Sequence, residues 1–247
     1  MYSSTMYSIN LIPLYLLTFI FLLQGINGID PLYHICSNSF SYASGSPYDK
    51  NLNILLNQLN TKVPPTGFGS SSVGTNQETV HGIALCRGDV PNSDCKSCVS
   101  TASSEILQRC PNDKGAIIWY DGCLLKYSNV KFFGTIDNGN KVYLYNVKNV
   151  SDINSFNQKT EKFLSQLSDE AYRSRLSFAT NQMSLGDLET LYGLVQCTRD
   201  LSNIQCKKCL DDAISELPSC CDGKRGGRVL GGSCNFRYEL YPFVISK

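Results

Sequence analysis

The chain has 247 residues, with 22 Lys and Arg against 21 Asp and Glu, and a formal net charge of +1. This length allows one large domain or two of ordinary size. The balanced charge, with no long basic run, argues against nucleic acid as a main partner. Apolar residues make up 42% of the sequence, which excludes a globally disordered chain. The 12 cysteines and two histidines are typical of a secreted disulfide scaffold and unusual for a cytosolic enzyme.

An uncharged apolar run at residues 11–23 predicts a signal peptide, residues 1–28, that is cleaved after Gly28. The run is short for a membrane span and is interrupted by Pro13, although an uncleaved anchor is the alternative. No second apolar stretch of about 18 residues follows. We therefore expect a mature chain that is soluble and extracellular and has no membrane span.

The mature sequence contains an internal repeat. Residues 82–98 resemble residues 193–209, and five cysteines recur at an offset of 111 positions. The five pairs are Cys86 and Cys197, Cys95 and Cys206, Cys98 and Cys209, Cys110 and Cys221, and Cys123 and Cys234. We expect two homologous domains, at 29–136 and 142–247, joined by a turn-prone linker at 137–141.

The first repeat begins with a predicted helix. Ser46 and Pro47 have the residue types of an N-cap and a first helical position, and an apolar stripe follows at Leu52, Leu55, Leu56 and Leu59. A second helix is predicted at 94–108. Strands are predicted at 80–87, 116–120 and 124–129.

The second repeat follows the same order. Ser155 and Gln158 have the form of a capping box at the start of its first helix, which continues through Phe156, Phe163, Leu164 and Leu167. The second helix is predicted at 205–218, and strands are predicted at 191–198, 228–230 and 235–240. The predicted fold class is α+β, in which each repeat packs two helices on an antiparallel β-sheet cross-linked by disulfides.

Two CxxC motifs, at 95–98 and 206–209, also fit redox or zinc chemistry. A redox site does not need the further cysteines that flank each motif. A zinc site would need both motifs together, and they lie in separate repeats. The oxidising compartment and the repeated spacing favour structural disulfides, so we expect neither a metal nor another cofactor.

The repeats differ in one cysteine each. Cys36 has no counterpart in the second repeat, whereas Cys220 is an addition next to Cys221. Because Cys221 corresponds to Cys110, Cys110 is the natural partner of Cys36. Cys220 and Cys221 then form a vicinal disulfide, remain thiols, or leave Cys220 exposed for an intermolecular bridge.

The cysteine spacing C-x8-C-x2-C-x11-C-x12-C, and the segments 31–34, 117–120 and 221–224, resemble the ginkbilobin-homologous domain of plants, also called the stress-antifungal domain. The resemblance covers almost the whole mature chain, twice, and is strongest to the tandem cysteine-rich repeat secretory proteins. It implies two helices packed on an antiparallel sheet. It also implies the disulfides Cys36–Cys110, Cys86–Cys95, Cys98–Cys123, Cys197–Cys206 and Cys209–Cys234.

Candidates for catalysis are few, and we expect no enzyme. The only histidines are His34 and His81, and no GxSxG, HExxH or paired-acid signature accompanies them. His81 corresponds to Tyr192 in the second repeat, which indicates a packing position. One N-x-[ST] sequon predicts a glycan on Asn149; the alternative is a polar loop that is never glycosylated.

The resemblance further implies a candidate sugar site, because the single-domain founder of the family binds mannose through an Asn, an Arg and a Glu. Arg228 and Glu239 occupy the matching places in the second repeat, and Asn146 is our choice for the amide. The first repeat has Ile117 and Ser128 at the two charged places, so it is not expected to bind mannose in this way. The alternative is that Arg228 and Glu239 form a structural ion pair across adjacent strands.

The sequence therefore predicts a secreted, non-catalytic binding protein of the plant apoplast with a role in stress or defence. The expected ligand is a mannose-type glycan. The alternative is a protein–protein interaction module that binds a receptor ectodomain or a plasmodesmal partner and no carbohydrate.

Overall fold

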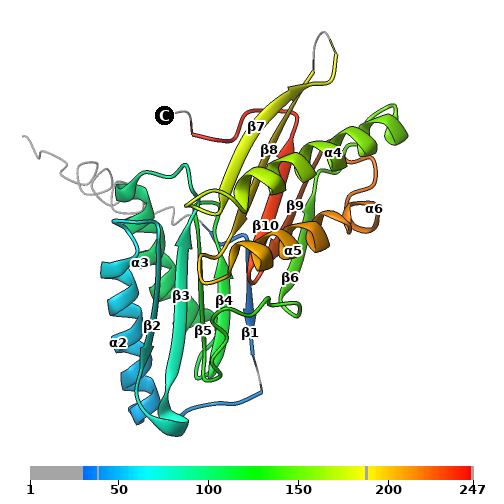
Figure 1. The fold of residues 1–247 in the computed structure, drawn as a ribbon. Coiled ribbons are helices and arrows are strands. Elements are labelled where there is room, and N and C mark those ends of the chain that lie inside the picture. The colour runs from blue at the N-terminus through cyan, green and yellow to red at the C-terminus, as the bar shows by residue number, and fades with distance from the viewer. Residues whose placement is uncertain (1–29, 38, 187–188, 246–247) are drawn as a thin grey trace, which may run out of the picture. The chain divides into compact units, whose positions relative to one another are not determined.

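The computed structural model describes residues 30–37, 39–186 and 189–245, and the remainder is drawn as a grey trace (Figure 1). The predicted signal peptide lies outside these residues. The chain divides into two units, Met1–Asp30 and Pro31–Lys247, and the description below concerns the second. No helix in the described part of the chain is long and apolar enough to cross a membrane.

The first repeat is a five-stranded antiparallel sheet with two α-helices, in the strand order β1-β4-β5-β3-β2. Its strands are β1 (Tyr33–Cys36), β2 (Phe68–Val73), β3 (Val80–Cys86), β4 (Gly115–Trp119) and β5 (Cys123–Ser128). Its helices are α2 (Pro47–Lys62), α3 (Asn92–Arg109) and the short 3₁₀ helix η1 (Asn76–Glu78).

The second repeat has the same architecture, with the strand order β6-β9-β10-β8-β7. Its strands are β6 (Lys141–Tyr145), β7 (Phe178–Ser184), β8 (Thr190–Cys197), β9 (Gly226–Gly231) and β10 (Cys234–Glu239). Its helices are α4 (Ile153–Ala171), α5 (Asn203–Ile214) and the short α6 (Leu217–Cys220). The predicted α+β class, two helices on each antiparallel sheet, is confirmed. Strand β6 starts at Lys141, the last residue of the predicted linker, and the domain limits themselves stay a prediction.

Local sequence signals explain where the first helix of each repeat begins. Ser46 caps α2, because its hydroxyl accepts a hydrogen bond from the Asp49 N–H at 3.3 Å, and Pro47 opens the helix. The capping box predicted at Ser155 is wrong: α4 begins two residues earlier, and the side chain of Asp152 accepts from the Ser155 N–H. Aspartate is as good an N-cap as serine, so the residue type alone does not decide between them.

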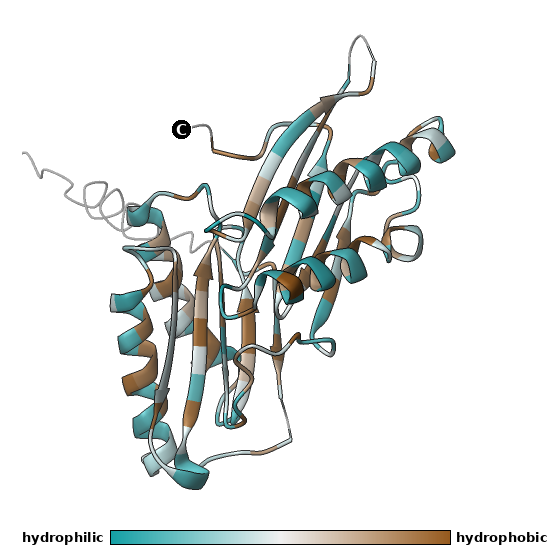
Figure 2. Ribbon diagram, viewed as in Figure 1, coloured by the Kyte–Doolittle hydropathy of each residue, from teal (hydrophilic) through white to brown (hydrophobic). Residues whose placement is uncertain are grey.

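Each sheet makes packing contacts on both of its faces. One face packs against the helices, and its residues form a core with the apolar stripe of α2 in the first repeat and of α4 in the second. Figure 2 shows the apolar residues along β3, β4 and one side of α2. On the opposite face, residues of β3, β4 and β5 pack with Leu230 of β9. The two repeats thus contact each other through the sheet faces that the helices do not cover.

Hydrogen bonds cross this contact between the sheets. The indole N–H of Trp119 donates to the Gly231 carbonyl at 3.1 Å, and the Gln196 side-chain amide donates to the Cys86 carbonyl at 3.0 Å. Both bonds are buried. Because each one satisfies a polar group that the contact removes from water, the two repeats have one specific arrangement.

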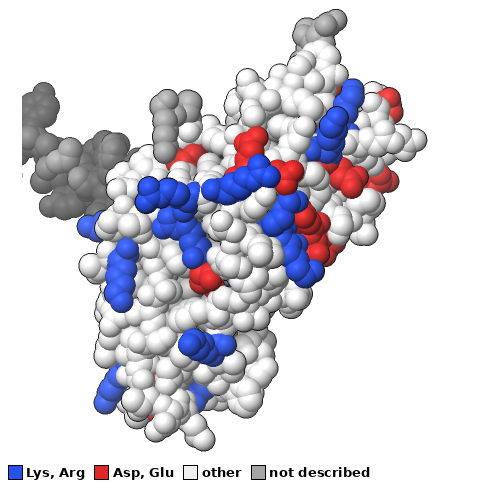
Figure 3. All heavy atoms as spheres, in the orientation of Figure 1, with Lys and Arg blue, Asp and Glu red and all other residues white. Residues whose placement is uncertain are grey.

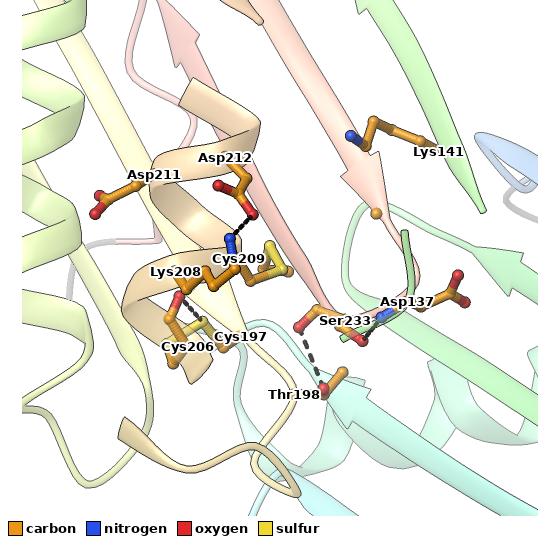
Figure 4. Close-up of a disulfide and its surroundings, with 12 residues drawn as sticks. Asp137, Lys141, Cys197, Thr198, Cys206, Lys208, Cys209, Asp211, Asp212 and Ser233 are labelled. Atoms are coloured by element: carbon orange, nitrogen blue, oxygen red, sulfur yellow. Dashed lines mark hydrogen bonds and ion pairs between the residues drawn. A yellow bond between two sulfur atoms is a disulfide. The ribbon is translucent and has the colours of Figure 1, made fainter. Parts of the chain in front are cut away.

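All 12 cysteines form disulfides. The pairs are Cys36–Cys110, Cys86–Cys95, Cys98–Cys123, Cys197–Cys206, Cys209–Cys234 and Cys220–Cys221. The first five are the pairs that the family resemblance implies, and the adjacent Cys220 and Cys221 are joined to each other. Figure 4 shows the second repeat, where bonds from Cys206 and Cys209 fasten α5 to the ends of β8 and β10.

Candidate functional site

The three residues of the predicted sugar site line one groove in the second repeat, with a volume of about 470 Å³. Arg228 lies in β9, Glu239 ends β10, and Asn146 directly follows β6. Strands β6, β9 and β10 are neighbours in the sheet. The groove therefore gathers side chains from three adjacent strands that are distant in the sequence.

Strand register places these side chains on one face of the sheet. Glu239 is the cross-strand partner of Gly226, and Arg237 is the partner of Arg228. The backbone N–H of Asn146 donates to the Gly226 carbonyl at 2.9 Å, so the row of residues continues from β10 through β9 to the end of β6. Cross-strand partners share a face of the sheet, so Asn146, Gly226 and Glu239 form one row across it.

Gly226 leaves the space that the Glu239 carboxylate uses. A β-carbon on Gly226 would overlap the carboxylate Oε2. The carboxylate therefore lies over β9, in the direction of β6 and Asn146. The Glu239 Oε1 accepts from the Arg237 Nε at 3.1 Å, which fixes the orientation of the carboxylate.

Arg228 is held by the first repeat. Its Nη1 donates to the Asp121 Oδ1 at 2.6 Å, and Asp121 lies in the turn between β4 and β5. Arg228 is 8% exposed, and its Nε is buried without a hydrogen-bond partner in the described structure. Burial lowers the pKa of the Arg228 guanidinium, and the Asp121 charge opposes this effect. The hydrogen bond that the Arg228 side chain makes in the described structure is therefore directed at the contact between the repeats.

Asp121 connects three arginines. Besides Arg228, its carboxylate accepts from the Arg87 Nη1 at 2.7 Å and the Arg237 Nη1 at 3.0 Å. Burial opposes ionisation of the Asp121 carboxyl, but the charges of Arg228, Arg87 and Arg237 outweigh burial and lower its pKa. Sequence reasoning missed both Asp121 and Arg237. The repeat offset aligns Arg237 with Lys126, so a cation recurs at this position and could have indicated Arg237. Nothing in the sequence pattern indicated Asp121.

The alternative prediction, that Arg228 and Glu239 form an ion pair with each other, is wrong. The two residues share a face and lie on adjacent strands, but Arg228 pairs with Asp121 and Glu239 pairs with Arg237. The reason is the register, which places Glu239 opposite Gly226 and Arg237 opposite Arg228.

The first repeat has a counterpart groove of about 260 Å³, and its chemistry is different. Its lining includes Ser37, Ile117 and Ser128, at or near the places of Asn146, Arg228 and Glu239. Lys126, the counterpart of Arg237, pairs with Asp137 at 2.5 Å. A β-carbon on Gly232, the counterpart of Asp121, would overlap the Asp137 carboxylate. Asp137, in the segment that joins the repeats, thus supplies the carboxylate that Gly232 of the second repeat cannot supply. The Asp137 N–H donates to the Ser233 hydroxyl (Figure 4).

The other residues considered from the sequence lie apart from the groove. The Nδ1 of His81 is 2.7 Å from the Ser72 hydroxyl, and its ring meets the edge of Phe133, as suits a packing position. Asn149 is exposed, and its amide oxygen accepts from the Lys224 Nζ at 2.9 Å. In the described residues, Cys36, Cys110 and Asp113 are close enough to form a metal site, but the two cysteines are joined in a disulfide and offer no thiolate.

Comparison with known proteins identifies relatives over most of the chain. The family described as salt stress response/antifungal matches residues 35–130 and 145–241. An "Antimicrobial ginkbilobin-2-like protein" of Castanea crenata is 60% identical over 90% of this chain and 92% of the relative. "Cysteine-rich repeat secretory protein 38" of Arabidopsis thaliana is 56% identical over 86% of this chain and 85% of the relative.

Solved structures agree with these relatives. The tandem DUF26 ectodomain of the Arabidopsis thaliana cysteine-rich receptor-like protein PDLP8 superposes with a TM-score of 0.76 at 25% identity. The match covers 87% of this chain and 100% of that ectodomain. The secretory relatives and the disulfides are those of a secreted, extracellular protein. The chain belongs to the stress-antifungal (DUF26) family and carries the family's domain twice.

Proposed function

We propose that this chain is a non-catalytic binding protein of the plant apoplast that acts in stress or defence and recognises mannose-type glycans in the groove of its second repeat. The family description and the antimicrobial relative support the role in defence. The observation that carries the proposed ligand is the convergence of Asn146, Arg228 and Glu239 on one groove.

The groove offers the donors and acceptors that a sugar needs. In the described structure, the Glu239 Oε2 and the Asn146 side-chain NH₂ make no hydrogen bond to protein, whereas the Glu239 Oε1 is occupied by Arg237. A carboxylate oxygen accepts from a sugar hydroxyl, and an amide N–H donates to a hydroxyl or ring oxygen. Tyr241 also lines the groove and is 49% exposed, so its ring can lie against an apolar face of the sugar.

In this proposal Arg228 acts through its neighbours. Its Nη1 is committed to Asp121, which also holds the Arg237 that orients Glu239. Arg228 therefore supports the floor of the groove, and Arg237 is the more accessible cation beside the ligand. The first repeat lacks this arrangement because Ile117 and Ser128 occupy the corresponding places.

A second candidate is a protein–protein interaction module without carbohydrate binding. The observation that favours it is the burial of Arg228 in an ion pair between the repeats, which is the arrangement expected of a structural cation. The structural neighbour is the ectodomain of a receptor-like protein, and ectodomains meet partners at the cell surface. In this candidate the groove residues stabilise the tandem arrangement that a partner recognises.

We further propose that Asn149 carries an N-linked glycan. The residue is exposed and lies between β6 and α4, where it forms an isolated β-bridge with Lys224. Mass spectrometry of secreted protein before and after enzymatic deglycosylation decides this point, with Asn149→Gln as the control that cannot be modified.

A glycan array separates the two candidate functions. Wild-type protein and the control variant Ser128→Ala, which alters the first-repeat groove, are expected to retain mannose-type glycans. Glu239→Gln and Asn146→Ala should each weaken this binding about tenfold, the effect of losing one strong hydrogen bond. If the array retains no glycan and the protein binds immobilised receptor ectodomains, the glycan-binding function is rejected in favour of the protein–protein interaction module.

A further inference from the structure

A second cleft, of about 540 Å³, lies between the repeats near the ends of β3 and β8. Arg87, Gly88 and Asn92 line it from the first repeat, and Arg175, Gln196 and Arg199 line it from the second. Figure 3 shows Lys and Arg atoms gathered where the segment between α4 and β7 meets the end of β3. The groove described above is a separate site.

Contacts between the repeats give this cleft a fixed shape. The first residue of β7, Phe178, packs on Gly88, where no β-carbon would fit. Its counterpart Phe68, the first residue of β2, lies 5.4 Å from the Arg199 guanidinium. The Arg199 Nη2 also donates to the Thr66 carbonyl at 2.8 Å. The first repeat thus holds Arg199 of the second repeat in place at the wall of the cleft.

The cleft carries uncompensated positive charge. Arg87 is neutralised, because it donates to both oxygens of Asp89 and to Asp121. Arg175 and Arg199, in contrast, have no ion pair in the described structure, and no acidic residue is among those that line the cleft. Burial lowers the pKa of the Arg199 guanidinium, and no carboxylate offsets this effect.

Backbone groups at the start of α3 add to this potential. Pro91 is the N-cap of α3 and offers no side-chain cap, whereas the equivalent Ser202 caps α5. The N–H groups of the first turn, which begins at Asn92 on the cleft wall, therefore lack that acceptor. The amino end of a helix favours negative charge, and Asp94 in the first turn meets part of this preference, so the helix end adds modestly to the effect of the two arginines.

We propose that this cleft binds the carboxylate of an acidic saccharide, specifically a short oligomer of hexuronic acid. The planar guanidinium of Arg199 or Arg175 matches a carboxylate with two parallel hydrogen bonds. Leu85, Val90 and Leu176 give the cleft an apolar part that suits the C–H faces of a sugar ring.

An acidic peptide fits this cleft less well. Strands β3 and β8 are each hydrogen-bonded to a neighbour on both edges. An extended peptide therefore cannot add to either strand, which is the usual way in which a sheet binds one. The proposal does not depend on the mannose-type function of the other groove.

Calorimetric titration of the full secreted chain with trigalacturonate tests this proposal. We expect binding that weakens as the salt concentration rises, because the ligand pairs with partly exposed arginines. The fully methyl-esterified trimer, which has lost its charge, should bind at least about tenfold more weakly. Inorganic phosphate and a short polyglutamate peptide are the two other probes. Tighter binding of either one than of trigalacturonate overturns the assignment to a saccharide.

Variants locate the binding to the cleft. Arg175→Ala and Arg199→Gln should each reduce the affinity for trigalacturonate about tenfold. Arg173→Ala is the matched control, because Arg173 is exposed two residues away and does not line the cleft. Arg199 also contacts Thr66, so the thermal midpoint of each variant is recorded beside its affinity. An unchanged affinity in Arg175→Ala and Arg199→Gln, or an equal loss in Arg173→Ala, contradicts the proposal. Glu239→Gln should leave this binding intact, which separates it from a failure of the mannose groove.

Discussion

The carboxylate of Asp121 and the guanidinium of Arg228 join the two repeats through a hydrogen bond of 2.6 Å, although 107 positions separate them in the sequence. The turn between β4 and β5 carries Asp121 to the sheet face of the second repeat. The equivalent turn of the second repeat has Gly232, and Asp137 supplies the carboxylate to Lys126 instead. The tandem arrangement is therefore stabilised by similar charge pairs that come from different positions in the two repeats.

Asp121→Asn should lower the free energy of unfolding by about 2 kcal/mol. The substitution leaves the buried Arg228 without its counter-charge, a loss of about 3–5 kcal/mol for a fully buried pair, which the exposure of Asp121 reduces. Urea unfolding followed by tryptophan fluorescence measures this, since Trp119 lies at the contact between the repeats. Asp212→Asn is the control, because it removes only an exposed pair with Lys208. Equal midpoints for the two variants would show that the Asp121 cluster contributes no stability.

Acid should weaken the same contact. The pKa values of the Asp121 and Asp137 carboxyls are lowered in the folded chain below their ordinary value of 3.8. Their ion pairs therefore stabilise the fold fully above that value, and this stability is lost as the pH falls through the lower folded pKa values. We expect these two groups to contribute no pH dependence between pH 7 and pH 5 and a steep fall in thermal midpoint below about pH 4. A wild-type curve that parallels that of Asp121→Asn through this acid range contradicts the assignment.

The disulfides should differ widely in what they contribute. Cys36–Cys110 closes a loop with a sequence separation of 74, and its removal by paired alanine substitutions should cost about 4 kcal/mol from loop entropy. Cys220–Cys221 has a sequence separation of 1 and restricts hardly any of the unfolded chain. The double variant Cys220→Ala/Cys221→Ala should therefore unfold close to wild type in a denaturant titration. A loss as large as that of the Cys36–Cys110 variant would show that the vicinal bond fixes native structure around α6.

Gly226→Ala tests the position of the Glu239 carboxylate. The added methyl group overlaps the flexible end of the Glu239 side chain and must displace the carboxylate from β9. Affinity for a mannose-type glycan should fall about tenfold if the carboxylate accepts sugar hydroxyls. Gly139→Ala is the matched control, because its methyl group makes only an ordinary contact with Asp137. Unchanged glycan affinity in Gly226→Ala, with an unchanged thermal midpoint, would remove Glu239 from the site.

Strands β3, β4, β5, β8 and β9 could be predicted from the sequence because both of their faces are buried at most positions. Residues of β3, such as Ile83 and Ala84, are apolar on successive positions, which gives a continuous signal. The four outer strands, β1, β2, β6 and β7, were not predicted. One face of β2 and one face of β7 are partly open to solvent. Polar residues are therefore tolerated there: β2 contains three consecutive serines, and β7 reads FATNQMS. Polar side chains there hide the alternation that marks a strand.

The candidate site could be predicted only in part for a related reason. The family resemblance located Arg228 and Glu239, and the offset of the repeats located their counterparts in the first repeat. Asp121 could not be found in this way because it contacts the site from the other repeat, and contacts between repeats leave no periodic signal in either one. The second helix of the second repeat was predicted to reach residue 218, whereas α5 ends at Ile214 and α6 begins at Leu217. The helical pattern of the sequence continues past the end of α5. The helix itself breaks because Pro218 fits only near the start of a helix, where it lies in α6.

The most direct test of glycan recognition is a titration of the ¹⁵N-labelled chain with mannotriose, in which the amide resonances of the two grooves are followed. Glycan recognition in the second-repeat groove predicts saturable shifts of the Asn146 side-chain NH₂ and of the Gly226 and Tyr241 amides, while the Ser128 amide in the first repeat does not move. These shifts should be lost in Glu239→Gln. No shift at millimolar mannotriose, or equal shifts at Ser128 and Gly226, would contradict glycan recognition by the second repeat.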